Sequence, residues 1–356
     1  MNITIRYGIN LLLLVSTLLL SLHSMAACTV TSAYTGFASL RGVNYSTGAD
    51  FPAGGTIYRQ LVNGNRSVSY NCTNGNARLT LSAVGGTPVP GMSDTWASGI
   101  AGVGMKLTAL NGSALPVTVP AGSASGTVTG PNLGFFAIAV KTGPITAGTA
   151  NGSLMPAVMW TVTDNSGIPV TVSSTSWNAN GFTLTTPSCT TPDYTYDLGA
   201  VNINDTSTTS NWVSTPVILT GCGAFYGNVA DNASYQSSQT TLTAGTFGNF
   251  SETGTRAKNI VSMTLTPQFT AIDPVNGVLA NSPNGGVYAR GVGVQVATVA
   301  GTTYTPLNLA NPVVIRPNLG STANITFPLA ARVIKTADVV NPGKIVTAAT
   351  YTIIYQ

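Results

Sequence analysis

The stretch KIVTAATYTIIYQ, residues Lys344–Gln356, has the two-residue period of a β-strand with one buried face. Successive side chains of a strand point to opposite faces, so residues of one parity share a face. A strand in this position leaves one edge to be paired by an earlier segment of the chain or by another molecule. The residues that share the apolar parity are Ile345, Ala349, Tyr351, Ile353 and Tyr355.

The first residues indicate export. Arg6 precedes an apolar run, residues 9–22, and small residues follow at Ser24 and Ala26. This order is typical of a secretory signal peptide, and the run is shorter than the roughly 20 residues that span a bilayer. We therefore expect residues 1–26 to be a signal peptide, cleaved after Ala26 or Ala27.

A second interpretation of this region is lipidation. The sequence MAAC, Met25–Cys28, loosely resembles the box that precedes a lipidated cysteine. Lipidation of Cys28 would leave Cys72 without an obvious partner, whereas even numbers of cysteines in secreted chains normally pair.

Four cysteines follow the predicted signal: Cys28, Cys72, Cys189 and Cys222. Of the three possible pairings, the long central gap favours Cys28 with Cys72 and Cys189 with Cys222. Each bridge would contribute about 3–4 kcal/mol in an oxidising compartment. One bridge in each half suggests two domains, as does a length of 356 residues against about 150 per domain.

The composition indicates a packed β-protein. Charged residues make up 7% of the chain and hydrophobic residues 44%, which favours a core over disorder. The net charge of +4 has no basic cluster, so nucleic acid is an unexpected partner. Alternating runs such as residues 79–83, 261–265 and 325–333 are separated by turn-rich segments. We expect an all-β fold of short antiparallel strands in sandwiches, with a boundary near residues 178–189.

The residue inventory argues against an enzyme. His23, the only histidine, lies in the predicted signal, and Glu252 is the only glutamate. Histidine-based triads and histidine-ligated metals are therefore not expected, and no cofactor or metal is predicted. A glycosidase needs only two facing carboxylates, so Asp50, Asp94 and Asp164 keep that alternative open. An isolated aspartate beside Gly, Asn or Ser more often caps a turn.

The second half resembles the chaperone–usher pilins. The features that carry the resemblance are Gly343, fourteenth from the end, Tyr355, next to last, FPLAARVIKT at 327–336, RGVGVQV at 290–296, and a cysteine pair framing DLGAVNI and PVILTGC. They run in order over residues 184–356.

The resemblance implies an immunoglobulin-like domain that lacks its last strand. Its C-terminal strand would border an open groove, filled first by a periplasmic pilus chaperone and, after passage through an outer-membrane usher, by the donor strand of an adjacent pilin subunit. The implied groove residues are Gly343, Tyr351, Ile353 and Tyr355, with the carboxylate of Gln356 as an anchor for basic chaperone side chains. Alternation alone leaves a complete sandwich open, in which the last strand pairs internally.

The N-terminal half is similar, more weakly, to the lectin domain of the type 1 fimbrial tip adhesin. The similarity lies in the order of features over residues 27–183, closing with SWNANGFTLTTPSC. Cys28 lies at or next to the predicted mature N-terminus, which leaves no donor strand ahead of it. A subunit that accepts a strand and donates none is expected at the tip of a fibre.

In that relative the sugar site uses the N-terminal residue, the loop after the second cysteine and a later polar loop. Asn74 matches this pattern, but Gly75 and Asn76 stand where an acidic and an aromatic residue are expected, and Val162 where a glutamine is expected. The resemblance therefore implies a glycan site without implying mannose. Trp96 and Tyr45 are candidate platforms, with edge-of-core packing as the alternative, and Trp160 and Trp177 are assigned to the core. The candidate ligand residues are Asn74, Asn76, Asp164, Asn165, Trp96 and Tyr45.

The sequence thus predicts a secreted, non-enzymatic fimbrial tip adhesin at the bacterial surface. Residues 27–183 would form the lectin-like, receptor-binding domain and residues 184–356 the pilin domain. The expected ligand is a host or surface glycan or receptor. The alternative is a minor tip or adaptor pilin whose first domain binds a protein.

Overall fold

The computed structural model describes residues 28–64, 66–229, 236–240, 250–283 and 287–356. The predicted signal peptide lies outside these residues. The described chain is all-β, as predicted, with two short 3-10 turns, η1 (Gly130–Leu133) and η2 (Gly152–Leu154). None of its helices has the length and apolar character needed to cross a membrane.

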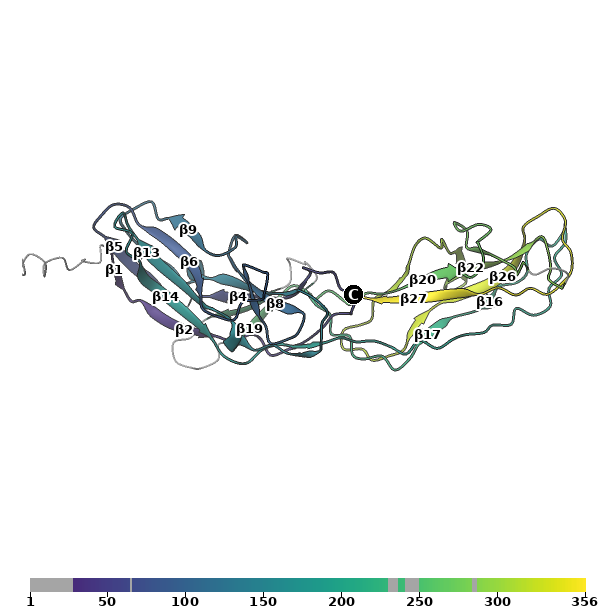
Figure 1. The fold of residues 1–356 in the computed structure, drawn as a ribbon, viewed down its shortest axis with the longest axis horizontal. Coiled ribbons are helices and arrows are strands. Elements are labelled where there is room, and N and C mark those ends of the chain that lie inside the picture. The colour runs from purple at the N-terminus through teal and green to yellow at the C-terminus, as the bar shows by residue number, and fades with distance from the viewer. Residues whose placement is uncertain (1–27, 65, 230–235, 241–249, 284–286) are drawn as a thin grey trace, which may run out of the picture.

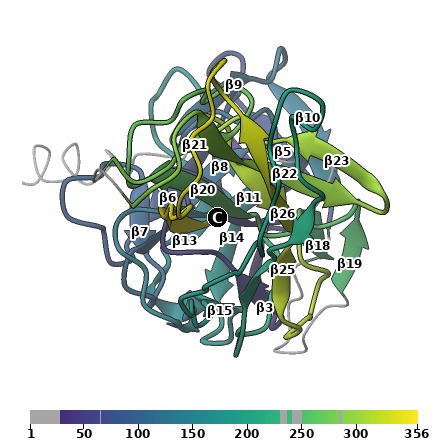
Figure 2. The same ribbon diagram turned by 90° about the vertical axis from the view of Figure 1, so that its right-hand side faces the viewer.

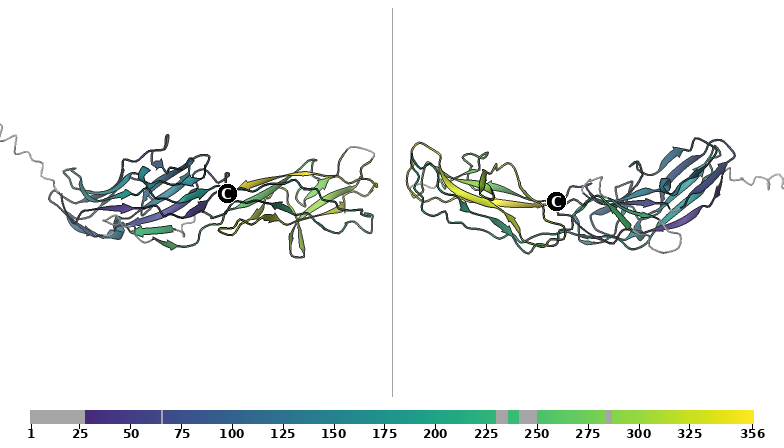
Figure 3. Two further views of the ribbon diagram at one scale, coloured as in Figure 1. Left: turned by 90° about the horizontal axis from the view of Figure 1, so that it is seen from below. Right: turned by 180° about the vertical axis from the view of Figure 1, so that it is seen from behind.

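The strands form two lobes placed end to end along the long axis (Figure 1). Gln356 lies between the lobes, where the arrowhead of the last strand points toward the first lobe. Figure 2 looks along this axis from the end of the second lobe, and Figure 3 shows the same two-lobed shape from below and behind. Each lobe has its own buried core, centred on Tyr58 and Phe182 in the first and on Phe225 and Phe327 in the second.

The first lobe contains four sheets around its core. A six-stranded sheet has the order β19 (Phe250–Thr253), β18 (Gln236–Thr240), β4 (Thr56–Asn63), β11 (Phe135–Lys141), β8 (Val103–Ala109) and β7 (Thr95–Ala97). A five-stranded sheet has the order β2 (Tyr34–Ala38), β14 (Val170–Trp177), β13 (Ala157–Thr163), β6 (Arg78–Val84) and β9 (Val117–Pro120). The two three-stranded sheets are β1 (Cys28–Thr31), β5 (Val68–Cys72) and β10 (Ser125–Val128), and β12 (Gly148–Thr149), β15 (Thr183–Thr185) and β3 (Asn44–Ser46).

The second lobe contains three sheets. One has the order β16 (Val213–Ser214), β26 (Leu329–Lys335), β22 (Val292–Ala300) and β21 (Val278–Ala280), with β23 (Thr303–Pro306) also paired to β22. A pair is formed by β17 (Val217–Leu219) and β25 (Ile325–Phe327). The third sheet has the order β24 (Val313–Ile315), β20 (Val261–Pro267) and β27 (Ala349–Tyr355).

Two strands from the second half of the sequence belong to a sheet of the first lobe. Strands β18 and β19 fall within the range 184–356, yet β18 pairs in parallel with β4 of the first lobe. Gln60 Nε2 donates to Gln239 Oε1 at 3.2 Å, and both side chains are buried. The division at residue 184 stays a prediction about sequence order, and the structure adds that residues 236–240 and 250–253 extend a sheet of the first lobe.

The disulfide pairing predicted from spacing is confirmed. Cys28 and Cys72 lie opposite each other in the β1–β5 ladder and are bonded, and Cys189 is bonded to Cys222. Each lobe therefore carries one bridge. The first ties the start of β1 to the end of β5, the central strand of their sheet, and the second ties the segment before the second lobe's first strand to the residues after β17.

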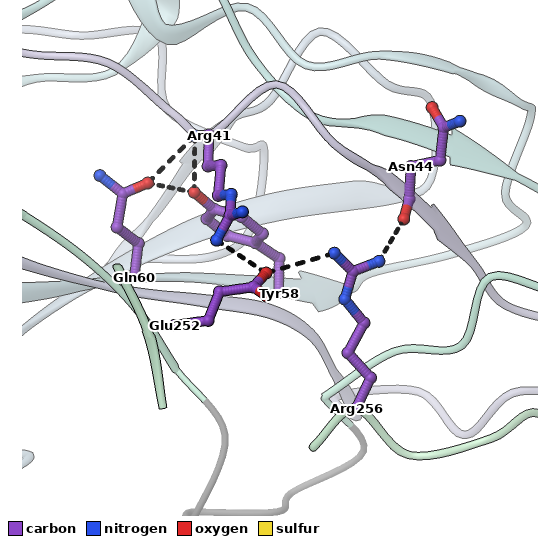
Figure 4. A network of polar contacts seen from close by, with 6 residues as sticks. All are labelled: Arg41, Asn44, Tyr58, Gln60, Glu252 and Arg256. Atoms are coloured by element: carbon purple, nitrogen blue, oxygen red, sulfur yellow. Dashed lines mark hydrogen bonds and ion pairs between the residues drawn. The ribbon is translucent and has the colours of Figure 1, made fainter. Parts of the chain in front are cut away.

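Polar contacts hold the returning hairpin against the first lobe (Figure 4). The carboxylate of Glu252 forms ion pairs with Arg41 at 2.7 Å and with Arg256 at 3.4 Å. Arg256 also donates to the backbone O of Asn44 at 2.7 Å, and its guanidinium lies 4.4 Å from the Tyr45 ring centroid. The only glutamate of the chain thus bridges an arginine of each half.

Candidate functional site

Strand β27 has one paired edge and one open edge. Hydrogen bonds mark both ends of its ladder with β20. Ile260 and Gln356 exchange N–H···O bonds at one end, and Gln268 N–H donates to Ala348 O at the other. In an antiparallel pair, alternate residues turn their N–H and C=O toward and away from the partner. Even-numbered residues therefore face β20, and Ala349, Tyr351 and Ile353 face away from it. No strand pairs with β27 on that side in the part of the chain that the structure describes.

A groove of ≈ 580 Å³ lies beside this open edge. Its apolar floor comes from strands of all three second-lobe sheets, and its side walls are the 347–351 segment and the 191–198 segment. The floor side chains are Val217, Leu265, Leu279, Val294, Val296, Leu329 and Ala331. This placement follows from strand alternation, because the inward residues of β22 and β26 face a position that no strand fills among the described residues of this lobe.

Two tyrosines bind the 191–198 wall of the groove to the segment around β17. The hydroxyl of Tyr194 donates to Ile218 O at 2.6 Å, and the hydroxyl of Tyr196 donates to Pro216 O. Their rings stack with centroids 5.8 Å apart. Burial raises the pKa of Tyr196 above its ordinary value. The 191–198 segment is therefore held next to β17, and it does not close over the floor of the groove.

At its end nearest the first lobe, the groove is bridged by side chains of β27. Tyr351 donates its hydroxyl to Pro192 O, and the hydroxyl of Tyr355 accepts from Cys189 N–H at 3.1 Å. Burial is the main cause that raises the pKa of both phenols. The empty volume consequently lies toward the start of β27.

The predicted groove residues occupy three positions. Tyr351 lines the groove, and Ile353 and Tyr355 lie on the same face of β27 against the second core. Gly343 lies away from the lining, where an added Cβ would be 2.4 Å from Ala289 N. The backbone O of Gln356 accepts from Ile260 N–H and from Asn259 Nδ2, so the end of the chain is held at the junction of the lobes.

The predicted ligand residues Asn74, Asp164 and Asn165 come together at the end of the first lobe far from the second. Asn165 N–H donates to Asn74 O at 3.0 Å, and Asn74 N–H donates to Asp164 Oδ2 at 3.1 Å. Asn76 is exposed two residues after Asn74. Figure 1 places β1, β5 and β13, which border these loops, at that end. The loops therefore form one polar surface.

Within this surface, Asp164 is a positioning residue. Its other oxygen, Oδ1, accepts from the Ser166 hydroxyl at 2.6 Å and from Ser166 N–H at 2.9 Å. The Ser166 hydroxyl is the largest cause that lowers the pKa of Asp164 below its ordinary value. Asp164 is 1% exposed, so its carboxylate ties the two loops together, while Asn74, Asn76 and Asn165 are exposed.

The two aromatic candidates lie elsewhere. Tyr45 is fully buried, with edge-on contacts to Tyr58 and Phe182, so its ring offers no face to a ligand. Trp96 lies beside Pro156 at the start of β13, whereas Asp164 follows the end of that strand. Seven strand residues span about 20 Å, so Trp96 is not part of the loop surface. Trp160 and Trp177 are both in the core, as predicted.

The three candidate carboxylates, those of Asp50, Asp94 and Asp164, do not form the facing pair that a glycosidase needs. Asp164 binds loop groups at the far end of the first lobe, Asp50 contacts Tyr355 at the junction, and Asp94 forms an ion pair with Lys106 at 3.6 Å. Asp164 also lies within 4.8 Å of the sulfurs of Cys28 and Cys72, but those sulfurs are bonded to each other and offer no thiolate to a metal.

No family model and no curated protein matches the chain. Among solved structures it is similar to the CupB6 tip adhesin from Pseudomonas aeruginosa, with 16% identity, 92% of this chain and 94% of that chain covered, and a TM-score of 0.32. It is also similar to the receptor binding domain of the adhesin MrkD1P of Klebsiella pneumoniae, with 18% identity, 46% and 98% covered, and a TM-score of 0.32. The P pilus rod subunit PapA is similar at 15% identity, 47% and 99% covered, and a TM-score of 0.31. These proteins are of the kind that the sequence resemblance names, and they are too remote to assign a function.

Proposed function

We propose that this protein is a fimbrial tip adhesin that is incorporated into its fibre by accepting a β-strand from another subunit. The observation that carries the proposal is the open edge of β27 beside the apolar groove. Ala349, Tyr351 and Ile353 present unpaired ladder positions, and the floor next to them is made of large aliphatic side chains. An extended peptide would satisfy both at once, because its backbone pairs with β27 while alternate side chains cover the floor.

The partners follow from the instability of an open groove in water. Leaving an apolar floor and a sheet edge uncovered favours aggregation, so the subunit needs an occupant from the time it folds. In the proposed pathway a periplasmic chaperone supplies the first strand, an outer-membrane usher receives the complex, and the adjacent pilin supplies the final strand. The adhesin then stands at the tip of a fimbrium on the bacterial surface.

The first lobe is proposed as the receptor-binding domain, with a glycan of the host or of another surface as its ligand. The support is the polar loop surface at the end most distant from the groove, where Asn74, Asn76 and Asn165 provide amide groups for planar hydrogen bonding. Binding is passive, and display on many fibres raises the avidity of a weak site. The second candidate function is that of an adaptor subunit whose first lobe binds a protein. It is favoured by the positions of Tyr45 and Trp96, neither of which supplies an aromatic ring to this surface.

The strand-accepting role can be tested with the full chain and a synthetic peptide of about ten residues in which Val alternates with Thr. A matched peptide with proline at alternate positions has the same length but lacks the N–H groups that a ladder needs. We expect the first peptide alone to raise the midpoint of thermal unfolding, by about 5 °C at saturation. Equal shifts with both peptides, or none with either, would contradict the proposal.

The ligand class can be tested separately on a glycan array. Binding that is lost in Asn74→Ala and Asn165→Ala and kept in Asn132→Ala, an exposed residue outside the loops, supports the lectin role. Absence of glycan binding together with capture of a defined protein of the fibre supports the adaptor role.

A further inference from the structure

The last ladder position of the open edge of β27 is already occupied by a residue of the first lobe. Tyr355 has the same parity as Ala349, Tyr351 and Ile353, so its N–H and C=O also face away from β20. Tyr355 N–H donates to Asp50 Oδ2 at 2.9 Å, and Asp50 N–H donates to Tyr355 O at 3.0 Å. Asp50 thus makes both bonds that a residue of an antiparallel partner strand would make there.

The segment that carries Asp50 is held firmly in this position. Lys141 Nζ donates to Ala49 O at 2.6 Å and to Phe51 O at 2.7 Å, one bond on each side of Asp50. Gly48 lies so close to β27 that an added Cβ would be 2.0 Å from Tyr355 O. The contact is therefore a close backbone approach that Gly48 permits and Lys141 stabilises, and it does not depend on one flexible side chain.

The groove also ends before β27 reaches Tyr355. Its lining includes the 347–351 segment of the chain and does not extend to Ile353 or Tyr355. The Tyr355 hydroxyl, which accepts from Cys189 N–H, closes the space beneath that end. The cavity therefore ends at Tyr351, and the pairing with Asp50 limits the free edge to the residues before Tyr355.

We propose that Asp50 is a stop residue that determines how far an incoming strand can pair with β27. The partner is an extended peptide that pairs with Ala349, Tyr351 and Ile353 and ends where Asp50 begins, so the register of the strand in the second lobe is set by a residue of the first. This inference rests on the proposed strand-accepting role of the groove. A strand that displaced Asp50 would pair with Tyr355 as well and would uncouple the Asp50 segment from β27.

Amide hydrogen exchange of the full chain distinguishes these two arrangements. The probe is the alternating Val/Thr peptide described above, and the sensitive groups are the N–H of Asp50 and the N–H groups of Ala349, Tyr351 and Ile353. On peptide binding we expect exchange at the three β27 amides to slow by about tenfold or more, with exchange at Asp50 unchanged. Faster exchange at Asp50, together with slowing along β27, would overturn the stop and leave the groove assignment intact.

Variants sharpen the test. Asp50→Ala removes the acceptor for Tyr355 N–H, so this amide should exchange fast in the free protein and slow down when the peptide is added, because the ladder gains one position. Asp50→Asn keeps an acceptor oxygen and should behave like the unchanged protein. Asp338→Ala, an exposed aspartate of the second lobe, is the matched control.

If peptide binding fails to protect Tyr355 N–H in Asp50→Ala, the stop is overturned. If Asp50→Ala does not fold, the measurement on the unchanged protein still decides between a retained and a displaced Asp50. No slowing at any β27 amide in the unchanged protein would overturn the strand-accepting role itself, and with it this inference.

Discussion

The Ser46 hydroxyl donates to Asn259 Oδ1 at 2.6 Å, although the two residues are 213 positions apart in the chain. Both side chains are buried where the lobes meet. Ser46 Oγ also accepts from Tyr226 N–H and Gly227 N–H, so it satisfies the backbone where the chain leaves the second lobe for the first. The junction is consequently a buried polar network that joins segments from both halves of the sequence.

Replacing Asn259 with alanine should loosen this junction. The amide accepts from Ser46 Oγ and Gly227 N–H and donates to Ser46 O and Gln356 O. Removing it leaves several buried groups unpaired, so we expect a loss of about 2–4 kcal/mol in the free energy of unfolding, measured by urea denaturation. The exposed Asn132→Ala is the control, expected within about 0.5 kcal/mol of the unchanged protein. Equal stability of both variants would show that the network does not hold the lobes.

Substitution Gly48→Ala should disturb the contact of the first lobe with β27. The new Cβ would meet backbone atoms of Tyr355 at 2.0 Å, so one segment must move. Overpacking of this kind costs about 1–3 kcal/mol, which a shift of the thermal midpoint would report. Gly42→Ala is matched, because its nearest atom outside the adjoining residues is Gly181 O at 3.8 Å. A Gly48→Ala protein as stable as Gly42→Ala would contradict the close approach.

Substitution Glu252→Gln should weaken the attachment of the β18–β19 hairpin in a salt-dependent way. It removes the charge that separates Arg41 from Arg256. Glu252 is 36% exposed, so solvent screening limits the expected loss to about 0.5–1.5 kcal/mol at low ionic strength, and less in high salt. Asp205→Asn removes the ion pair between Asp205 and Lys335. Because the Asp205 side chain is 88% exposed, this change should alter stability very little. Urea midpoints at two salt concentrations test both, and a salt-independent loss in Glu252→Gln would exclude an ionic origin.

The polar loop surface should be sensitive to acid through Asp164. Its pKa is lowered in the folded state, chiefly by the Ser166 hydroxyl, so its contribution to stability is present above the ordinary pKa near 4 and is lost as the pH falls through the folded-state pKa. Ser166→Ala moves that pKa upward, and the acid loss of stability should begin at higher pH. Unfolding midpoints between about pH 2 and pH 6 measure the change.

The control for this pH dependence is Ser69→Ala, whose hydroxyl contacts the Thr127 hydroxyl at 2.8 Å on the sheet surface. It touches no carboxylate, so its acid profile should match that of the unchanged protein. Parallel profiles for Ser166→Ala and Ser69→Ala would contradict the assignment of Asp164 as the tie between the loops.

Local patterns in the sequence predicted the features that depend on near neighbours. The alternation in residues 344–356 predicted β27 and the parity of Tyr351, Ile353 and Tyr355, and cysteine spacing predicted both disulfides. The resemblance implied that Asn74 and Asn165 belong to one site, and the structure brings their loops together. Tyr45, a candidate ligand platform, is instead buried in the core. Its position depends on the rings that pack around it, Tyr58 and Phe182, which lie far away in the sequence or on another strand.

Side-chain period and cysteine spacing are local properties, so an all-β chain with two disulfides and a strand at residues 349–355 could be predicted without coordinates. Three features required the folded chain: the pairing of β18 with β4, the place of Asp50 beside Tyr355, and the groove left open by the 191–198 segment. Backbone pairing between distant segments depends on register and on which edges remain free. Backbone N–H and C=O groups are nearly the same in every residue, so the sequence does not show which of them will pair.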